Sequence, residues 1–194
     1  MRRRCGQTRG TRAELTTGLN SVFDGSQISR SAHTLGKGTV KNILGFRFAS
    51  GMFEPTGNRR YIEHVQVTVA EEIGIEGRGA FYEQTGAIRD MVSTHLFQMM
   101  TFLAMEPPVS FEPDRLRDET VKVLRAAQPI DPKDVVVGQY DDYHAAEGGA
   151  TGTTGATSVA VKLEPGTRRR AEYPVSQPTG KVLAQQATRE DDSA

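Results

Sequence analysis

The sequence has little of what a disulfide-rich, strongly charged or membrane-spanning protein needs. Its 194 residues include one cysteine, Cys5, which excludes an intrachain disulfide framework and a zinc site built from several cysteines. The 24 basic and 24 acidic residues leave no net charge, so no overall field attracts the chain to nucleic acid or to an anionic membrane. No apolar run approaches the roughly 20 residues that a membrane-spanning helix requires.

The N-terminal twelve residues are basic, with arginines at positions 2–4, 9 and 12. Because no apolar segment follows them, they do not form a signal peptide. We expect residues 1–12 to be a disordered end rather than a phosphate-binding arm. Without an export signal, and with a single cysteine, the expected location is the cytoplasm.

Apolar periodicity predicts the main elements of residues 13–144, which we expect to form the core domain. It predicts a short helix at 13–23, a strand at 61–71, a long helix at 85–105 and a further helix within 111–127. Residues 39–50 could begin as a helical turn and end in an aromatic packing segment. The strand shows period-two alternation, and the long helix carries one apolar stripe: Ile88, Val92, Leu96, Met99 and Leu103.

The amino-acid composition changes after residue 144. Residues 145–157 are rich in glycine and threonine, which is typical of a linker. A phosphate-binding loop is the alternative, but the spacing fits neither G-x-G-x-x-G nor a P-loop. Alternation predicts a short strand at 159–163, and low apolar content predicts poor order from about Pro165. We therefore expect residues 158–194 to form a degenerate strand segment and a disordered tail.

Few residues stand out as chemical candidates from pattern alone. The histidines His33, His64, His95 and His144 form no metal-ligand motif, so we expect no metal site. His95 lies beside the apolar stripe and is either a half-buried structural residue or a general base. The pair His33 and Lys37 is either surface charge or an anion clamp.

Several longer motifs, in order, resemble the glucose-6-phosphate dehydrogenase family. They are FRFASGMFEP (46–55), EGRGAFYE (76–83), IRDMVSTHL (88–96) and AMEPP (104–108), preceded by shorter matches between residues 22 and 37. The resemblance covers about residues 14–143 and resumes weakly at 158–181. It implies an α+β fold, a mainly antiparallel sheet with packed helices, resembling a truncated C-terminal domain of the family. We expect the Rossmann domain of the family to be absent, since no glycine-rich fingerprint occurs in this sequence.

The resemblance also implies a set of site residues. His95 matches the catalytic histidine that takes the proton from the C1 hydroxyl of the sugar. The substrate-binding positions of the family are matched by five residues: His33, Lys37, Glu71, Asp90 and Lys181. Cations there suit a phosphate, and carboxylates suit sugar hydroxyls. The implied cofactor is NADP, for which this chain offers no cofactor-binding residue.

Some positions depart from the family pattern. Ala32 stands where the family has the aspartate that orients the catalytic histidine, and loss of such a group lowers turnover. Thr94 replaces an asparagine beside that histidine. Aromatic residues of the family are replaced at four further positions: Thr34, Gly57, Arg168 and Arg170.

The resulting hypothesis is an oxidoreductase fragment of the pentose phosphate pathway. The family oxidises glucose 6-phosphate at C1 to the lactone with NADP, and we expect this chain to be inactive alone. A non-catalytic sugar-phosphate-binding module and a non-functional truncated gene product are the alternatives; the latter would aggregate through unpaired strand edges. We expect glucose 6-phosphate as partner, no nucleic acid and no membrane, and the resemblance implies a homo-oligomer through the sheet domain.

Overall fold

The computed structural model describes residues 9–28, 38–49, 51–52, 55–145, 153, 155–166, 174–183 and 187–193. The chain divides into two units, residues 1–33 and 34–194. The first unit holds helix α1 (Arg9–Asn20) and the 3₁₀ turn η1 (Gly25–Gln27). Helix α1 confirms the helix predicted at 13–23, with an earlier start and end. Residues 9–12 belong to α1, so the expectation of a disordered end at 1–12 was wrong there, whereas residues 1–8 lie outside the described residues.

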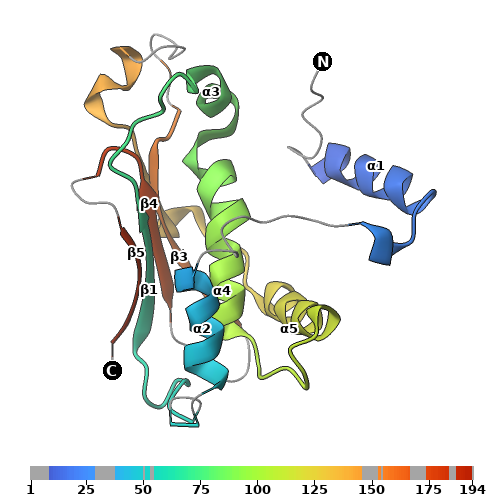
Figure 1. Ribbon diagram of the computed structural model, residues 1–194. Helices are drawn as coiled ribbons and strands as arrows, with labels where there is room; N and C mark the ends of the chain where they lie inside the picture. The colour runs from blue at the N-terminus through green and yellow to red at the C-terminus, as the bar shows by residue number, and fades with distance from the viewer. Residues whose placement is uncertain are drawn as a thin grey trace. The chain divides into compact units, whose positions relative to one another are not determined.

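The second unit is built on a five-stranded sheet with the order β2-β3-β4-β1-β5 (Figure 1). The strands are β1 (His64–Ala70), β2 (Val135–Gly138), β3 (Ser158–Leu163), β4 (Val175–Gly180) and β5 (Ala187–Ser193). Strand β1 pairs parallel with β4, whereas β1–β5, β2–β3 and β3–β4 are antiparallel. The mainly antiparallel sheet of the predicted α+β fold is therefore confirmed.

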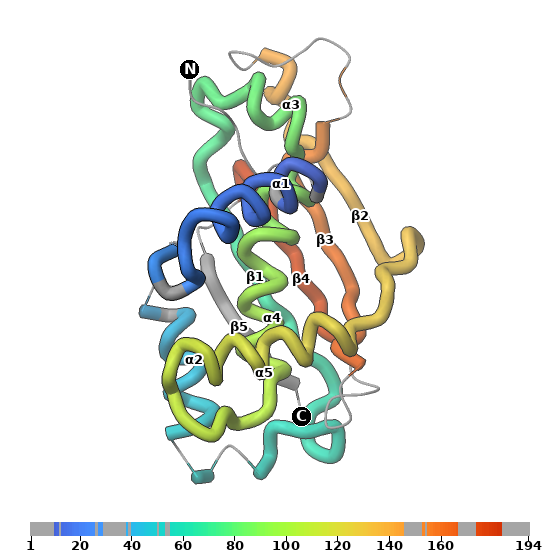
Figure 2. Tube along the Cα trace, turned by 90° about the vertical axis from the view of Figure 1, so that its right-hand side faces the viewer, coloured from blue at the N-terminus to red at the C-terminus, as the bar shows by residue number. Residues whose placement is uncertain are grey.

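The core lies between one face of this sheet and a layer of helices. Val65, Val67 and Val69 of β1 are buried and alternate with half-buried residues, which confirms the period-two reading. The helices of this layer are α2 (Gly38–Phe48), α4 (Phe97–Ala104) and α5 (Pro113–Ala126), and Figure 2 shows them in front of the strands. The segment predicted to be part helical turn and part packing segment is helical through Phe48.

The long helix predicted at 85–105 is present but not uniform. It consists of α3 (Gly79–Ala87), a π-helix η3 (Ile88–Leu96) and α4. Gly86, with φ of 60° and ψ of 171°, breaks the helical path between α3 and η3. The stripe prediction was wrong for Ile88, which is 43% exposed, whereas its other four members are at most 3% exposed. The kink and the wider turn rotate Ile88 away from the core.

Two hydroxyl side chains within residues 88–96 bond to backbone carbonyls of the same helix. The Ser93 hydroxyl donates to the Arg89 carbonyl at 2.7 Å, and the Thr94 hydroxyl donates to the Asp90 carbonyl. Both acceptors lie four residues earlier and are the carbonyls that an α-helix would use. Such bonds compete for these carbonyls and slightly weaken the α-helical pattern.

The expectation of poor order from about Pro165 was wrong for β4. Val175, Gln177 and Thr179 alternate with half-buried residues and are all buried, and β4 has strand partners on both sides. Two of these three side chains are polar, so apolar content could not reveal a central strand, which the flanking strands stabilise through backbone hydrogen bonds. The predicted segment boundaries at residues 12, 144 and 157 stay predictions, and most of the 145–157 linker lies outside the described residues.

Candidate functional site

The parallel pairing of β1 and β4 places two charged residues at one edge of the sheet. The register pairs Val69 with Thr179 and Ala70 with Gly180, so Glu71 and Lys181 are the next residues of the two strands. The Glu71 amide continues the ladder by donating to the Gly180 carbonyl at 3.0 Å. In a parallel pair both strands end on the same side, which brings together residues 110 positions apart.

Glu71 and Lys181 form an ion pair between Oε2 and Nζ. The lysine side chain is only 5% exposed and the carboxylate 31%. Burial lowers the pKa of Lys181, because the surroundings disfavour a charged ammonium. The carboxylate compensates that charge and remains partly accessible at the edge of the sheet, whereas the ammonium group lies beneath it.

Tyr82 and Asp90 extend this edge from the helical side. The Tyr82 hydroxyl donates to Asp90 Oδ2 at 3.3 Å, and Lys181 Nζ lies 5.9 Å from the centre of the Tyr82 ring. Burial and the negative charge of Asp90 raise the pKa of Tyr82, so the phenol remains a hydrogen-bond donor. Pattern reasoning missed Tyr82; its signal was its place in the EGRGAFYE motif, eight residues before Asp90.

His95 is half-buried on the π-helix that also carries Asp90. The Phe97 amide donates to the Val92 carbonyl, a bond across five residues that marks the π pattern. Because Asp90 and His95 are also five residues apart, they lie on successive turns of this helix.

Leu96, the residue after His95, is hydrogen-bonded to the sheet. The Leu96 carbonyl accepts a hydrogen bond from Gln177 Nε2 of β4 at 3.0 Å, and Gln177 is fully buried. Pattern reasoning missed Gln177 because β4 was not predicted; the alternation of Val175, Gln177 and Thr179 was the available signal.

The structure therefore brings four residues into one cluster: Glu71, Lys181, Tyr82 and Asp90. Two further predicted site residues, His33 and Lys37, lie outside the described residues, as does Ala32. The roles predicted for His95, His33, Lys37, Glu71, Asp90 and Lys181 stay predictions.

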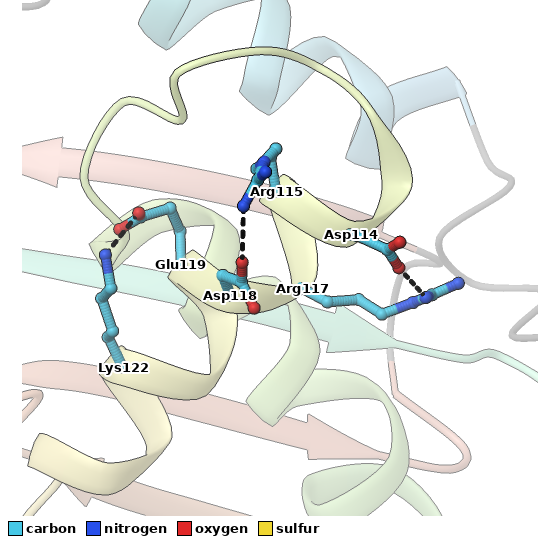
Figure 3. A network of polar contacts seen from close by, with 6 residues as sticks. All are labelled: Asp114, Arg115, Arg117, Asp118, Glu119 and Lys122. Carbon is cyan, nitrogen blue, oxygen red and sulfur yellow. Dashed lines mark hydrogen bonds and ion pairs between the residues drawn. The ribbon is translucent and has the colours of Figure 1, made fainter. Parts of the chain in front are cut away.

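Helix α5 carries another charged surface, and its charges pair along the helix (Figure 3). Three ion pairs join residues three apart: Asp114–Arg117, Arg115–Asp118 and Glu119–Lys122. Most of these side chains are more than half exposed, and exposed pairs of this kind contribute little stability. Since each of these three cations already has a carboxylate beside it, this surface resembles a solvated helix face.

The described residues offer neither a metal site nor a dinucleotide-binding turn. Within the described ranges, no three His, Cys, Asp or Glu side chains gather as a metal site would require. No helix there is both long and apolar enough to cross a bilayer. NADP needs a glycine-rich turn between a strand and the start of a helix, and the sequence has no G-x-G-x-x-G. These residues therefore do not fit the cofactor.

Comparison with known proteins gives a consistent family. The model of the glucose-6-phosphate dehydrogenase C-terminal domain matches residues 44–190. The chain is 41% identical over 191 residues to glucose-6-phosphate 1-dehydrogenase 2 of Mycobacterium bovis, covering 90% of this chain and 36% of the relative. It is 40% identical to glucose-6-phosphate 1-dehydrogenase of Rhizobium meliloti, covering 92% of this chain and 39% of the relative.

Solved structures of glucose-6-phosphate dehydrogenases also match this chain. A crystal structure of glucose-6-phosphate 1-dehydrogenase from Mycobacterium avium matches with a TM-score of 0.89 and 37% identity, over 95% of this chain and 42% of that one. A glucose-6-phosphate dehydrogenase in complex with glucose 6-phosphate matches with a TM-score of 0.90 and 35% identity, over 95% and 40%. The chain thus spans about two fifths of the lengths of these proteins. It belongs to the glucose-6-phosphate dehydrogenase family of oxidoreductases, of which it corresponds to the C-terminal domain.

Proposed function

We propose that this chain binds glucose 6-phosphate and forms the substrate half of a glucose-6-phosphate dehydrogenase. The observation that carries this proposal is the buried Lys181 paired with the accessible Glu71, next to Tyr82 and Asp90. A sugar phosphate needs cations for its phosphate and carboxylate acceptors for its hydroxyls, and this cluster offers both kinds of group. The related dehydrogenase solved with glucose 6-phosphate supports the choice of ligand.

Each residue has a distinct role in this proposal. Lys181 supplies a positive charge, with His33 and Lys37 as the further cations. Glu71 and Asp90 accept hydrogen bonds from sugar hydroxyls, and the Tyr82 phenol holds the Asp90 carboxylate through its hydrogen bond.

His95 is the proposed base that takes the proton of the C1 hydroxyl, since imidazole titrates near neutral pH. The family reaction would yield the lactone. The oxidant of the family reaction would be NADP, which the described residues do not fit. We accordingly expect binding without turnover by the isolated chain.

A sugar-phosphate-binding module without catalysis is the second candidate. Ala32, which stands where the family has the aspartate that orients the catalytic histidine, favours it. Cytoplasmic location is part of either proposal and is supported by the cytoplasmic glucose-6-phosphate 1-dehydrogenase 6 of Arabidopsis thaliana, 45% identical over 130 residues.

Calorimetric titration of the full chain with glucose 6-phosphate tests the proposal. We expect saturable binding that Lys181→Met weakens by about tenfold or more, since it removes a charge-assisted contact. Lys122→Met is the matched control, because Lys122 is 67% exposed and pairs only within α5. Glucose without phosphate should bind far more weakly. Absence of saturable binding, or equal affinity in Lys181→Met, would contradict the proposal.

An absorbance assay at the wavelength of reduced nicotinamide tests for the dehydrogenase, and turnover in this assay would exclude the module. The chain is mixed with glucose 6-phosphate and NADP, and His95→Asn serves as the comparison. Turnover that His95→Asn abolishes supports the dehydrogenase and argues against the module. Binding without turnover agrees with both candidates.

A further inference from the structure

Residues 155–157, here called the strap, lie between the start of the π-helix and the end of β4. The Ala156 carbonyl accepts a hydrogen bond from the Ala87 amide at 2.8 Å. The next carbonyl, that of Thr157, accepts from the Lys181 amide at 3.1 Å. Two adjacent residues of the strap therefore hold the backbone of two separate elements.

Both held amides belong to the segments that carry the candidate site. Ala87 is the N-cap of η3, three residues before Asp90, and Lys181 is itself in the cluster. Gly86 breaks the helical path just before Ala87, so this amide meets the strap carbonyl rather than one in the preceding turn. The strap thus sets where the π-helix begins relative to the edge of the sheet.

A half-buried carboxylate, that of Glu83, anchors the strap. Glu83 of α3 accepts two hydroxyl hydrogen bonds, from Tyr143 at 2.7 Å and from Thr153 at 2.6 Å. The Thr153 hydroxyl also accepts from the Gly155 amide at 3.1 Å, which ties the strap to the carboxylate. Tyr143 is fully buried, and burial with the nearby Glu83 raises its pKa, so the phenol remains a donor.

Further bonds hold the strap against the segment that follows β2. Gln139 Nε2 donates to the Gly155 carbonyl at 2.8 Å, and the Tyr140 amide donates to the Thr157 hydroxyl at 3.0 Å. The Thr157 amide donates to the Gly138 carbonyl at 2.9 Å. These hydrogen bonds fix the position of the strap relative to residues 138–140.

We propose that Glu83, through Tyr143 and Thr153, is a positioning residue that uses the strap to fix Asp90 and Lys181 relative to each other. This inference rests on the proposed function, since those two residues belong to the proposed sugar-phosphate site. The hydrogen bonds of Glu83 go to Tyr143 and Thr153, outside the proposed site, so it would act through the two backbone amides that the strap holds.

Thr153→Val in the full chain tests this proposal, because it keeps the side-chain shape and removes the hydroxyl that joins Glu83 to Gly155. Thr153→Ser restores the hydroxyl. Thr120→Val on α5 is the matched control, since its hydroxyl donates only to the Arg117 carbonyl of the same helix at 2.9 Å. Tyr143→Phe removes the other donor to Glu83 and replaces Thr153→Val if that variant does not fold.

The first readout is amide hydrogen exchange at Ala87 and Lys181, followed by NMR. We expect Thr153→Val to speed exchange at both amides by about tenfold, because the strap opens locally. Thr153→Ser and Thr120→Val should leave both rates near the wild-type values. A change confined to overall melting, with unchanged exchange at these two amides, overturns the proposal.

The second readout is the dissociation constant for glucose 6-phosphate. We expect Thr153→Val to weaken binding by about 3- to 10-fold, the size of one hydrogen bond, and Thr153→Ser to restore it. Faster exchange with unchanged affinity overturns the positioning role. If the wild-type chain does not bind glucose 6-phosphate, the proposed function fails, and exchange at the two amides alone decides whether the strap holds them.

Discussion

Replacement of Arg47 by methionine should markedly destabilise the helical layer. Arg47 lies in the last turn of α2 and is 6% exposed. Its guanidinium donates to the Phe102 carbonyl at 2.6 Å and to the Met105 carbonyl at 2.8 Å. These carbonyls lie at the C-terminal end of α4, where a helix has no internal donors left and its dipole favours a cation.

The expected loss in the free energy of unfolding follows from those two hydrogen bonds. A hydrogen bond to a charged group contributes about 1.5–3 kcal/mol, and a buried acceptor left without a donor costs about 1–3 kcal/mol. Because the Phe102 bond is only partly buried, water recovers some of the loss. We expect Arg47→Met to lower the free energy of unfolding by about 3 kcal/mol. Arg47→Lys keeps the charge but not the forked geometry and should lose about half as much.

Urea unfolding followed by circular dichroism measures this loss. At a slope of about 2 kcal/mol per molar urea, the midpoint should fall by about 1.5 M with an unchanged slope. Arg117→Met is the matched control, since its side chain is 72% exposed and pairs only with Asp114 on its own helix. That variant should stay within about 0.5 kcal/mol of the wild type. A similarly small loss in Arg47→Met would refute the reasoning.

Three further predictions concern the candidate site. Glu71→Gln should lower stability at neutral pH by about 1–3 kcal/mol, because it leaves Lys181 charged and buried. Burial already lowers the pKa of Lys181, so the unfolded state binds more protons than the folded state. The stability of Glu71→Gln should therefore recover as the pH rises toward about 10. Thermal melts of this variant at several pH values would show the recovery, and a pH-independent loss of stability would contradict it. Gly86→Ala should cost about 1–3 kcal/mol in urea unfolding, since φ of 60° with ψ of 171° suits glycine alone; an unchanged midpoint would exclude strain there. Tyr82→Phe should weaken glucose 6-phosphate binding by about threefold in calorimetry, because Asp90 loses its donor; unchanged affinity would remove Tyr82 from the site.

Local patterns were sufficient for most of the elements. The alternating valines of β1 face the core, and the helix predicted within 111–127 is α5, which begins at Pro113, a residue suited to the first turn. Such patterns depend on neighbours along the chain, so one sequence reveals them. The motifs at 46–55, 76–83 and 88–96 likewise predicted the family, which the comparisons confirm.

The same reasoning failed where partners distant in the sequence decide the conformation. Strand β4 contributes polar Gln177 and Thr179 to the buried face and depends on β1 and β3 for its pairing. The π-helix was read as an ordinary helix, because the break at Gly86 and the hydroxyl bonds of Ser93 and Thr94 are not visible in apolar spacing.

The sequence by itself determined the family, the mainly antiparallel α+β fold and the chemical types of the candidate site residues. Only the tertiary structure decided which of them meet. Glu71 and Lys181 are joined because β1 and β4 run parallel and end at one edge, and Asp90 joins them through Tyr82. Side-chain type is a property of each residue, whereas such proximity arises from strand pairing and helix packing across more than one hundred residues.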